Sequence, residues 1–126
     1  MNNYILNPDI FSPDVKQEPI RAGFGRGLKE AGADNDKIVA LCADLTESTQ
    51  VHLFRDAFPS RFIQVGIAEQ NLVAVASGLA CAGKIPFAVA YAAFHPGRNW
   101  EQIKTTVALN DQPVKIVASH AGVTVG

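Results

Sequence analysis

Apolar residues along this chain follow two patterns, and their alternation predicts the order of helices and strands. Four continuous apolar runs have the length of buried strands, and each is preceded by a segment whose apolar residues recur every three or four positions. We expect helices at 20–32, 50–58, 69–82 and 99–109, and strands at 37–43, 61–65, 85–90 and 114–119. Gly32 is expected to end the first helix. The alternation predicts an α/β fold in which a parallel sheet carries helices on both faces.

The first 19 residues follow neither pattern. Pro8, Pro13 and Pro19 stand among Asn, Asp and Ser, and proline opposes both helix and sheet. We therefore expect an extended arm over 1–18 and one domain over 19–126. The chain stops in a glycine-containing loop soon after its fourth predicted strand, whereas an α/β domain ordinarily continues, so this domain is expected to be incomplete at its C-terminus.

Glu69 stands out because it is the one charged residue between Arg61 and Lys84. A run of small apolar residues follows it closely, which predicts a helix packed on most sides. Glu69 would lie in the first turn of that helix, where free backbone N–H groups and the helix dipole favour an anion. Two interpretations remain open: a capping interaction at the helix start, or a carboxyl that shares a proton with a ligand.

Polar and aromatic residues follow each predicted strand. Asp44 follows the first strand, Glu69 the second, Tyr91 and Phe94 the third, and His120 the fourth. The carboxyl ends of parallel strands share one edge of a sheet, and ligands bind at that edge in open α/β folds, so these side chains are expected to converge. Simpler alternatives exist: Asp44 could cap the next helix, and the two aromatic residues could fill the core instead of lining a pocket for a flat ring.

Composition narrows the class of protein. With 48% hydrophobic and 18% charged residues, the 126-residue chain is typical of one folded domain. Eleven basic and twelve acidic residues nearly balance, so nothing predicts nucleic acid as a partner, and the apolar runs are too short to predict a membrane span. Cys42 and Cys81 lie in apolar runs without metal-ligand spacing, which predicts buried, reduced thiols and a cytoplasmic location.

Several short motifs occur along the chain in a specific order and spacing. They are Arg21 with Phe24-Gly25, Asp44-Leu45-Thr46 with Ser48, Phe58-Pro59 with Arg61-Phe62, Gly66-Ile67-Ala68-Glu69-Gln70-Asn71, Gly78-Leu79-Ala80, Tyr91 with Phe94, and His120-Ala121-Gly122-Val123. Together they resemble the pyrimidine-binding domain of transketolase, from about Pro19 to Gly126. The resemblance implies the thiamine-diphosphate-binding fold and a transferase that moves two-carbon ketol units between sugar phosphates.

The resemblance implies a role for each polar residue of these motifs. Glu69 matches the catalytic glutamate that hydrogen-bonds a ring nitrogen of the cofactor's aminopyrimidine, which promotes loss of the thiazolium proton. Asp44 matches an acidic residue near the cofactor and the substrate channel. His120 matches a histidine that faces the reacting centre and binds substrate. Arg21 and Ser48 match residues that hold the sugar phosphate, for which a guanidinium is suited.

The aromatic residues of the motifs are matched less completely. Tyr91 and Phe94 match rings that stack on the aminopyrimidine. A third aromatic residue that many transketolases carry corresponds here to Gly97, which weakens one wall of the expected pocket. Trp100 is the candidate to replace it.

The sequence does not contain every part of a thiamine-diphosphate site. It has no Gly-Asp-Gly motif followed by Asn at the spacing that binds diphosphate through Mg²⁺. The resemblance implies that a partner, an N-terminal diphosphate-binding subunit or domain, holds Mg²⁺ and diphosphate, and that this chain is inactive alone. It resembles the C-terminal subunit of a split transketolase, which implies a dimer of heterodimers. The helix after Glu69 is expected either to face that partner or to be buried by its own sheet.

Two other functions remain. The first is a part of a 1-deoxyxylulose-5-phosphate synthase, a family that shares the Gly66-Ile67-Ala68-Glu69-Gln70 run; His120, with the segment from Asp44 to Ser48, favours transketolase. The second is a non-catalytic interaction module with the same fold, which the short length favours and the retained site residues oppose.

Overall fold

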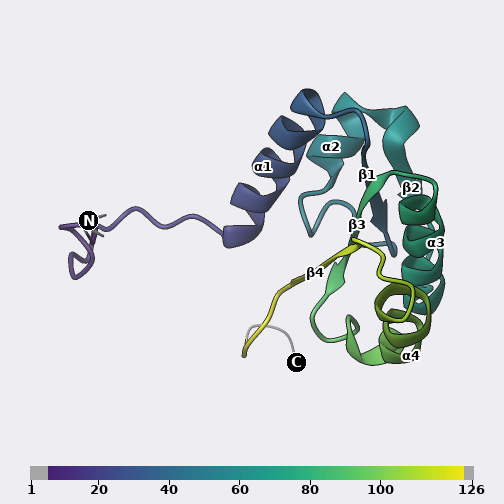
Figure 1. Cartoon of the computed structure of the whole chain (residues 1–126). Coiled ribbons are helices and arrows are strands. Elements are labelled where there is room, and N and C mark those ends of the chain that lie inside the picture. Colours follow the sequence, from purple (N-terminus) through teal and green to yellow (C-terminus); the bar gives the residue numbers. More distant parts are fainter. Residues whose placement is uncertain (1–5, 124–126) are drawn as a thin grey trace, which may run out of the picture.

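The computed structural model, which describes residues 6–123, contains one sheet of four parallel strands in the order β2-β1-β3-β4, with helices on both faces (Figure 1). The α/β class predicted from the alternation of patterns is therefore confirmed. The strands are β1 (Ile38–Cys42), β2 (Phe62–Gln64), β3 (Ile85–Tyr91) and β4 (Lys115–Ser119). The helices are α1 (Ile20–Asp34), α2 (His52–Ala57), η1 (Pro59–Arg61), α3 (Glu69–Cys81), η2 (Gly97–Asn99), α4 (Trp100–Gln102) and η3 (Ile103–Ala108).

The core lies on both sides of the sheet, and β1 shows why. All of its residues are buried, because it is a central strand that pairs with β2 and β3. Ile38, Ala40 and Cys42 pack with buried residues of α1 and α2 on one face. Val39 and Leu41 pack with buried residues of α3 on the other face. A strand that is buried on both faces has a continuous run of apolar residues, which explains why the strand predicted at 37–43 agrees closely with β1.

Helix α1 continues past Gly32 to Asp34, so the expectation that Gly32 ends it is wrong. Gly32 is buried, and a Cβ atom added there would lie 2.5 Å from a ring carbon of Phe54 in α2. This glycine therefore allows two helices to approach closely. The end of α1 is held by Arg61, whose guanidinium donates to the carbonyl oxygens of Gly32 over 2.8 Å and Asn35 over 3.0 Å.

Helix α3 has one buried face, packed against its own sheet and η3, and one exposed face. Its exposed face carries small residues, including Ala74, Gly78 and Cys81. The expectation that both cysteines are buried is therefore wrong for Cys81, although Cys42 is buried and both are free thiols. Within residues 6–123, no helix is long and apolar enough to cross a membrane.

The segment after β3 is helical from Gly97 to Ala108, close to the predicted range, but η3 is wound as a π-helix. Side chains take part in its backbone hydrogen bonding. The Thr106 hydroxyl donates to the carbonyl of Gln102 over 2.6 Å, and the Ser77 hydroxyl of α3 donates to the carbonyl of Thr106 over 2.6 Å. Such bonds to helix carbonyls compete with regular α-helical bonding.

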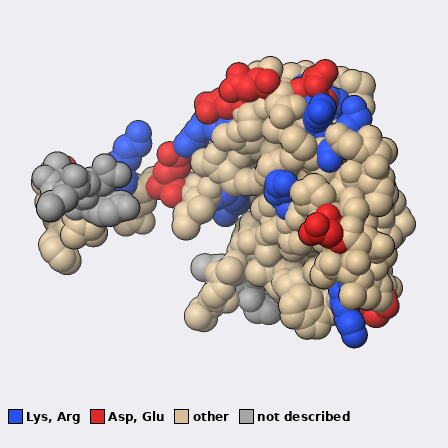
Figure 2. Space-filling view, viewed as in Figure 1, with Lys and Arg blue, Asp and Glu red and all other residues tan. Residues whose placement is uncertain are grey.

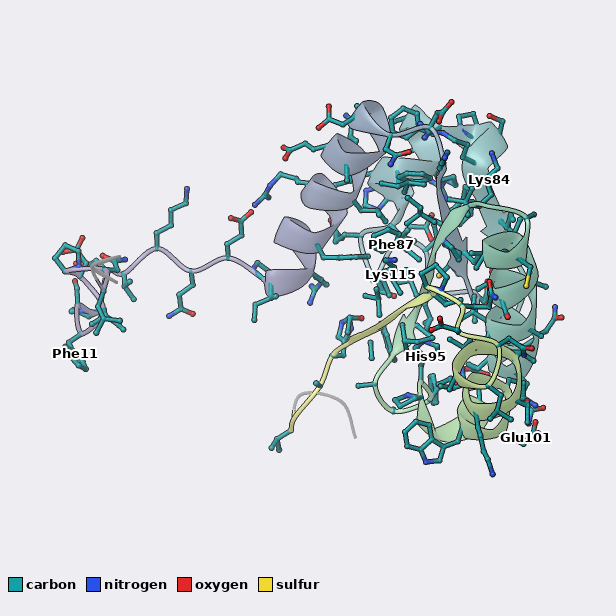
Figure 3. All side chains as sticks on the ribbon, in the orientation of Figure 1. Phe11, Lys84, Phe87, His95, Glu101 and Lys115 are labelled. Carbon is teal, nitrogen blue, oxygen red and sulfur yellow. The ribbon has the colours of Figure 1, made fainter. Side chains whose placement is uncertain are left out.

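The chain before α1 contains turns, with no helix or strand over residues 6–19. Figure 1 shows it leading away from the sheet, and Figure 3 places the exposed Phe11 near its far end. Residues 1–5 of the predicted arm and 124–126 of the predicted domain lie outside the described residues, and the division into arm and domain stays a prediction. On the face shown in Figure 2, basic and acidic side chains are interspersed, in keeping with the near-balance of charge.

Candidate active site

The loops that follow the four strands leave the sheet at the same edge. The register shows this directly, because Cys42 at the end of β1 pairs with Gln64 at the end of β2 and with Val89 near the end of β3. Tyr91 at the end of β3 pairs with Ser119 at the end of β4. The order in which the chain adds strands to the sheet also reverses between β1 and β3: β2 lies on one side of this pair and β4 on the other. Ligands bind at such switch points in open α/β sheets.

Glu69 begins α3 at this edge, with 5% of its surface exposed. No side chain among the described residues caps α3, so the capping interpretation of Glu69 is not supported. Its carboxylate faces Arg98 instead, with 3.5 Å between Oε1 and Nη1. The guanidinium of Arg98 also lies over the ring of Phe94, 4.3 Å from the ring centroid. Arg98 lies in η2, and the sequence motifs do not indicate it as a site residue.

A cavity of about 220 Å³ opens beside these groups, and we call it the Glu69 cavity. Its walls include Asp44 after β1, Ile67 and Glu69 after β2, and Phe94 and Arg98 after β3. Three of the residues predicted from strand ends therefore share one cavity. A second hollow, lined by the segment from Ile67 to Asn71 and by Arg98, adjoins it at Glu69.

The predicted aromatic residues lead from this cavity to His120. The rings of Tyr91 and Phe94 are nearly parallel, with an interplanar angle of 11° and 6.3 Å between centroids. The Tyr91 and His120 rings lie 4.1 Å apart at 40°. His120 has a left-handed backbone with φ of 57°, which is uncommon outside glycine, and its Nδ1 lies 2.8 Å from the Ser119 hydroxyl. The structure thus brings Glu69, Phe94, Tyr91 and His120 together along one edge.

Asp44 is positioned by Gln64, a second residue that the sequence motifs do not indicate. The side-chain oxygen of Gln64 accepts from the backbone N–H of Asp44 over 2.8 Å and of Gly66 over 3.2 Å, and its amide donates to the Thr46 hydroxyl over 3.0 Å. One amide therefore joins the loops after β1 and β2. Asp44 does not cap α2, whose N-cap position is Val51, so that alternative for Asp44 is not supported.

Two fully buried polar residues, His95 and Asn99, lie directly behind Glu69. The side-chain amide of Asn99 donates to the backbone carbonyl of Glu69 over 3.0 Å, and the same nitrogen lies 2.6 Å from Nδ1 of His95. Because an amide nitrogen only donates, Nδ1 of His95 accepts and its ring proton is on Nε2. Burial lowers the pKa of His95 below its ordinary value, since the charged ring would be desolvated. Figure 3 shows His95 inside the fold beside α4.

The two residues expected to hold a sugar phosphate lie outside the Glu69 cavity. Arg21 is exposed near the start of α1 and lines a separate hollow with Ser119 and Ala121, the neighbours of His120. The hydroxyl of Ser48 donates to the carbonyl of Leu45 over 3.2 Å within its own loop.

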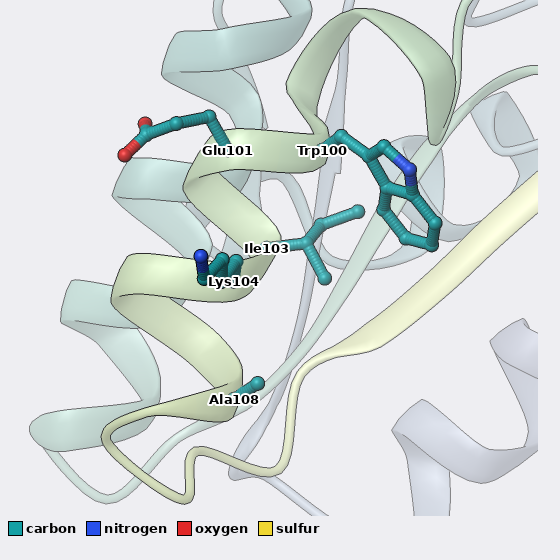
Figure 4. A pocket seen from close by; sticks show the side chains of 5 residues that line it. All are labelled: Trp100, Glu101, Ile103, Lys104 and Ala108. Carbon is teal, nitrogen blue, oxygen red and sulfur yellow. The ribbon is translucent and has the colours of Figure 1, made fainter.

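Trp100 does not line the Glu69 cavity, so the expectation that it replaces a third aromatic wall is not supported. Its side chain is 66% exposed. Its side chain lies on the same side of this helical segment as Ile103 and Ala108, with which it lines an apolar hollow, and Glu101 points to the opposite side (Figure 4). Gly97 stands at the position of the third aromatic residue, and the guanidinium of the adjacent Arg98 lies over the ring of Phe94.

Similarity to known proteins identifies the family of this chain. The transketolase pyrimidine-binding domain family matches residues 16–126, which is most of the chain. The chain belongs to the transketolase pyrimidine-binding domain family. It is 49% identical over 107 residues to a Methanocaldococcus jannaschii protein assigned as a transketolase C-terminal section, which covers 85% of this chain and 34% of that protein.

Other proteins similar to this transketolase-family chain include a solved structure and a related enzyme. A solved structure described as a split-gene transketolase, inactive beta4 tetramer, superposes with a TM-score of 0.73 at 47% identity, over 81% of this chain and 34% of the other. The 1-deoxy-D-xylulose-5-phosphate synthase of Corynebacterium glutamicum (strain R) is 40% identical over 121 residues, or 95% of this chain and 19% of that enzyme. The chain thus spans about a third or less of the length of these relatives.

The transketolase family uses thiamine diphosphate, and the Glu69 cavity can be tested for its fit to that cofactor. The aminopyrimidine of thiamine diphosphate is a flat heterocycle with ring nitrogens, so it needs a hydrogen-bonding side chain and an apolar ring face side by side. Glu69 offers a carboxyl with 6% of its side chain exposed, and Phe94 offers a ring on the same cavity. The residues present therefore fit the aminopyrimidine half of the cofactor.

Proposed function

We propose that this chain provides the aminopyrimidine-binding half of a thiamine-diphosphate site in a transketolase, which transfers two-carbon ketol units between sugar phosphates. The observation that carries the proposal is the pairing of a buried carboxyl, Glu69, with the ring of Phe94 on one cavity at the carboxyl edge of the sheet. The family match over residues 16–126 supports the same cofactor.

Glu69 is the catalytic residue of this proposal. When bound, thiamine diphosphate supplies a carbon nucleophile that can carry the two-carbon unit. Glu69 would hold a proton at a ring nitrogen of the aminopyrimidine and so favour deprotonation at the thiazolium carbon. Phe94 would stack on the ring, and Asp44 would border the cofactor from the loop after β1. Tyr91 would support Phe94 and His120 through its contacts with both rings.

His120 and Arg21 would serve the substrate. His120 follows β4 at the end of the aromatic series, where it would hydrogen-bond a hydroxyl or carbonyl of the sugar. Arg21 lies beside the residues that flank His120, and its exposed guanidinium could bind a phosphate in bidentate fashion. Ser48 would join it only after its hydroxyl leaves the carbonyl of Leu45.

The other half of the site would come from a partner. We propose a diphosphate-binding subunit or domain of the transketolase type, which would hold Mg²⁺ and diphosphate against the Glu69 cavity in a dimer of heterodimers. The share of the relatives' length that this chain spans, about a third or less, supports an additional component. The small residues on the exposed face of α3 would permit close packing against it. We also propose that the assembly works in the cytoplasm.

The test is the exchange of the thiazolium proton of thiamine diphosphate bound to the assembled protein. Glu69→Ala should slow this exchange by about 10²-fold or more, because a positioned general acid contributes a factor of this size. Glu30→Ala, which changes an exposed glutamate of α1, is the matched control and should leave the rate unchanged. An unaltered exchange rate in Glu69→Ala would remove the proposed role.

A second candidate function is a part of a 1-deoxyxylulose-5-phosphate synthase, favoured by the 40% identity to such an enzyme. The assembled protein should be assayed with xylulose 5-phosphate and ribose 5-phosphate, and separately with pyruvate and glyceraldehyde 3-phosphate. Turnover of the first pair supports transketolase, and turnover of the second supports the synthase. A non-catalytic module would bind the partner but not thiamine diphosphate, which calorimetry on the same assembly detects.

A further inference from the structure

Arg98 contacts both groups that would bind the aminopyrimidine. Its Nη1 lies 3.5 Å from Oε1 of Glu69, and its guanidinium carbon lies 4.3 Å from the centroid of the Phe94 ring. We propose that Arg98 competes with the aminopyrimidine for Glu69 and Phe94 and must leave them before the ring binds. This inference rests on the proposed function and adds to it a residue that opposes cofactor binding.

The ring and the guanidinium cannot share Phe94. The Tyr91 and Phe94 rings are 6.3 Å apart, and a planar group between two parallel rings needs about 7 Å, twice the contact distance of carbon atoms. The open face of Phe94 is therefore the face toward the Glu69 cavity. Arg98 lines that cavity and Tyr91 does not, so a heterocycle that reaches Glu69 and stacks on Phe94 would enter the space that Arg98 holds.

Arg98 also compensates a buried charge. The side chain of Glu69 is only 6% exposed, and a buried carboxylate without a partner is unfavourable. The guanidinium of Arg98 provides that partner. Once the aminopyrimidine hydrogen-bonds Glu69, the carboxyl has a new partner and the ion pair is no longer required.

Arg98 is able to leave. Its side chain is 56% exposed, whereas Glu69 is held at the start of α3 by the hydrogen bond between its carbonyl and Asn99. The flexible partner of the pair is therefore the arginine, which can turn into solvent or toward a partner subunit. A partly exposed ion pair and a partly exposed cation–π contact are each modest, so the need to break them should make the wild type bind the cofactor about two- to tenfold more weakly than a protein without them.

The test compares thiamine diphosphate affinity, by calorimetry with saturating Mg²⁺, for the assembled protein carrying Arg98→Met. This substitution keeps much of the side-chain length but removes the charge. We expect affinity to rise by about two- to tenfold, because the state without cofactor loses both contacts. Arg26→Met is the matched control: Arg26 of α1 is 53% exposed and pairs with Glu18, which precedes the helix, so the affinity of this variant should equal that of the wild type. Unchanged or weaker binding by Arg98→Met overturns the inference.

A double-mutant cycle keeps this result separate from the proposed function. In a Glu69→Gln background the gain from Arg98→Met should be smaller, since the ion pair is already lost. An equal gain in affinity in both backgrounds would show that Arg98 does not compete with the aminopyrimidine for Glu69, and it overturns the inference. If the wild-type assembly binds no thiamine diphosphate, the proposed function and this inference both fail. If it binds and Glu69→Ala slows proton exchange while Arg98→Met changes nothing, only this inference fails. Circular dichroism confirms that each variant is folded.

Discussion

The side-chain amide of Asn99 donates a hydrogen bond to the backbone carbonyl of Glu69, with 3.0 Å between Nδ2 and O. This bond links the first turn of α3 to the helical segment after β3, although the two residues are thirty positions apart in sequence. It fixes the backbone from which the Glu69 carboxyl projects. The same amide contacts His95, so a small buried polar group supports the proposed active site.

Replacing Asn99 by Leu should therefore destabilise the fold. His95 would lose the donor to its Nδ1, and a buried polar atom without a partner costs about 1–3 kcal/mol. We expect the free energy of unfolding, measured by urea titration, to fall by this amount. Asn71→Leu, an exposed position on α3, should change it by less than about 0.5 kcal/mol. Equal effects at both positions would contradict the structural role of Asn99.

The buried His95 predicts a pH dependence of stability. Burial lowers its pKa in the folded state below the ordinary value of 6.5, so below about that pH the unfolded chain binds more protons than the folded one. Stability contributed by neutral His95 is thus present above pH 6.5 and is lost as the pH falls toward the folded-state pKa. Denaturation midpoints measured from neutral to mildly acid pH should decrease in the wild type and decrease less in His95→Gln. Parallel curves for the two proteins would rule this out.

Glycines of α1 should respond to substitution in opposite directions. A Cβ at Gly32 would lie 2.5 Å from Phe54 and 2.9 Å from Phe58, so Gly32→Ala should lower the free energy of unfolding by about 1–3 kcal/mol through overpacking. Gly27 has no atom within 4 Å of the corresponding position, so Gly27→Ala should raise it by about 0.5–1 kcal/mol through helix propensity. Thermal unfolding of the two variants checks both signs. The same sign for both would contradict the packing of α1 on α2.

The fold could be predicted from the sequence because its signals are local. The buried strand β1 is apolar throughout, and parallel strands follow from the alternation with helices. The convergence of Asp44, Glu69 and Phe94 then follows from topology alone. The phase of α3 could not be predicted, because a run that is apolar on every side does not reveal which face is exposed. Cys81 was placed wrongly for this reason.

The residues that complete the site could not be found in the same way. Arg98 and Asn99 lie next to each other in a short helical turn, yet one is exposed and the other fully buried. Polar residues in loops carry no periodicity from which burial can be read. Gln64 is also a polar residue at a strand end, and its role depends on two loops that meet only in the folded chain. Trp100 is a candidate for the aromatic pocket from its residue type, but its position at the start of α4 directs its side chain into a different hollow.

The contacts of Arg61 have a consequence for how this chain folds. The carbonyl groups of Gly32 near the end of α1 and of Asn35 just after it accept from the guanidinium of Arg61, the last residue of η1 before β2. This guanidinium also stacks on Phe58 at 4.0 Å. A nascent chain that ends before Arg61 lacks these donors, so the final turn of α1 would fray. The helix is completed only when the second strand reaches the sheet. Formation of α1 is therefore coupled to long-range assembly, and the two segments should gain protection from hydrogen exchange together.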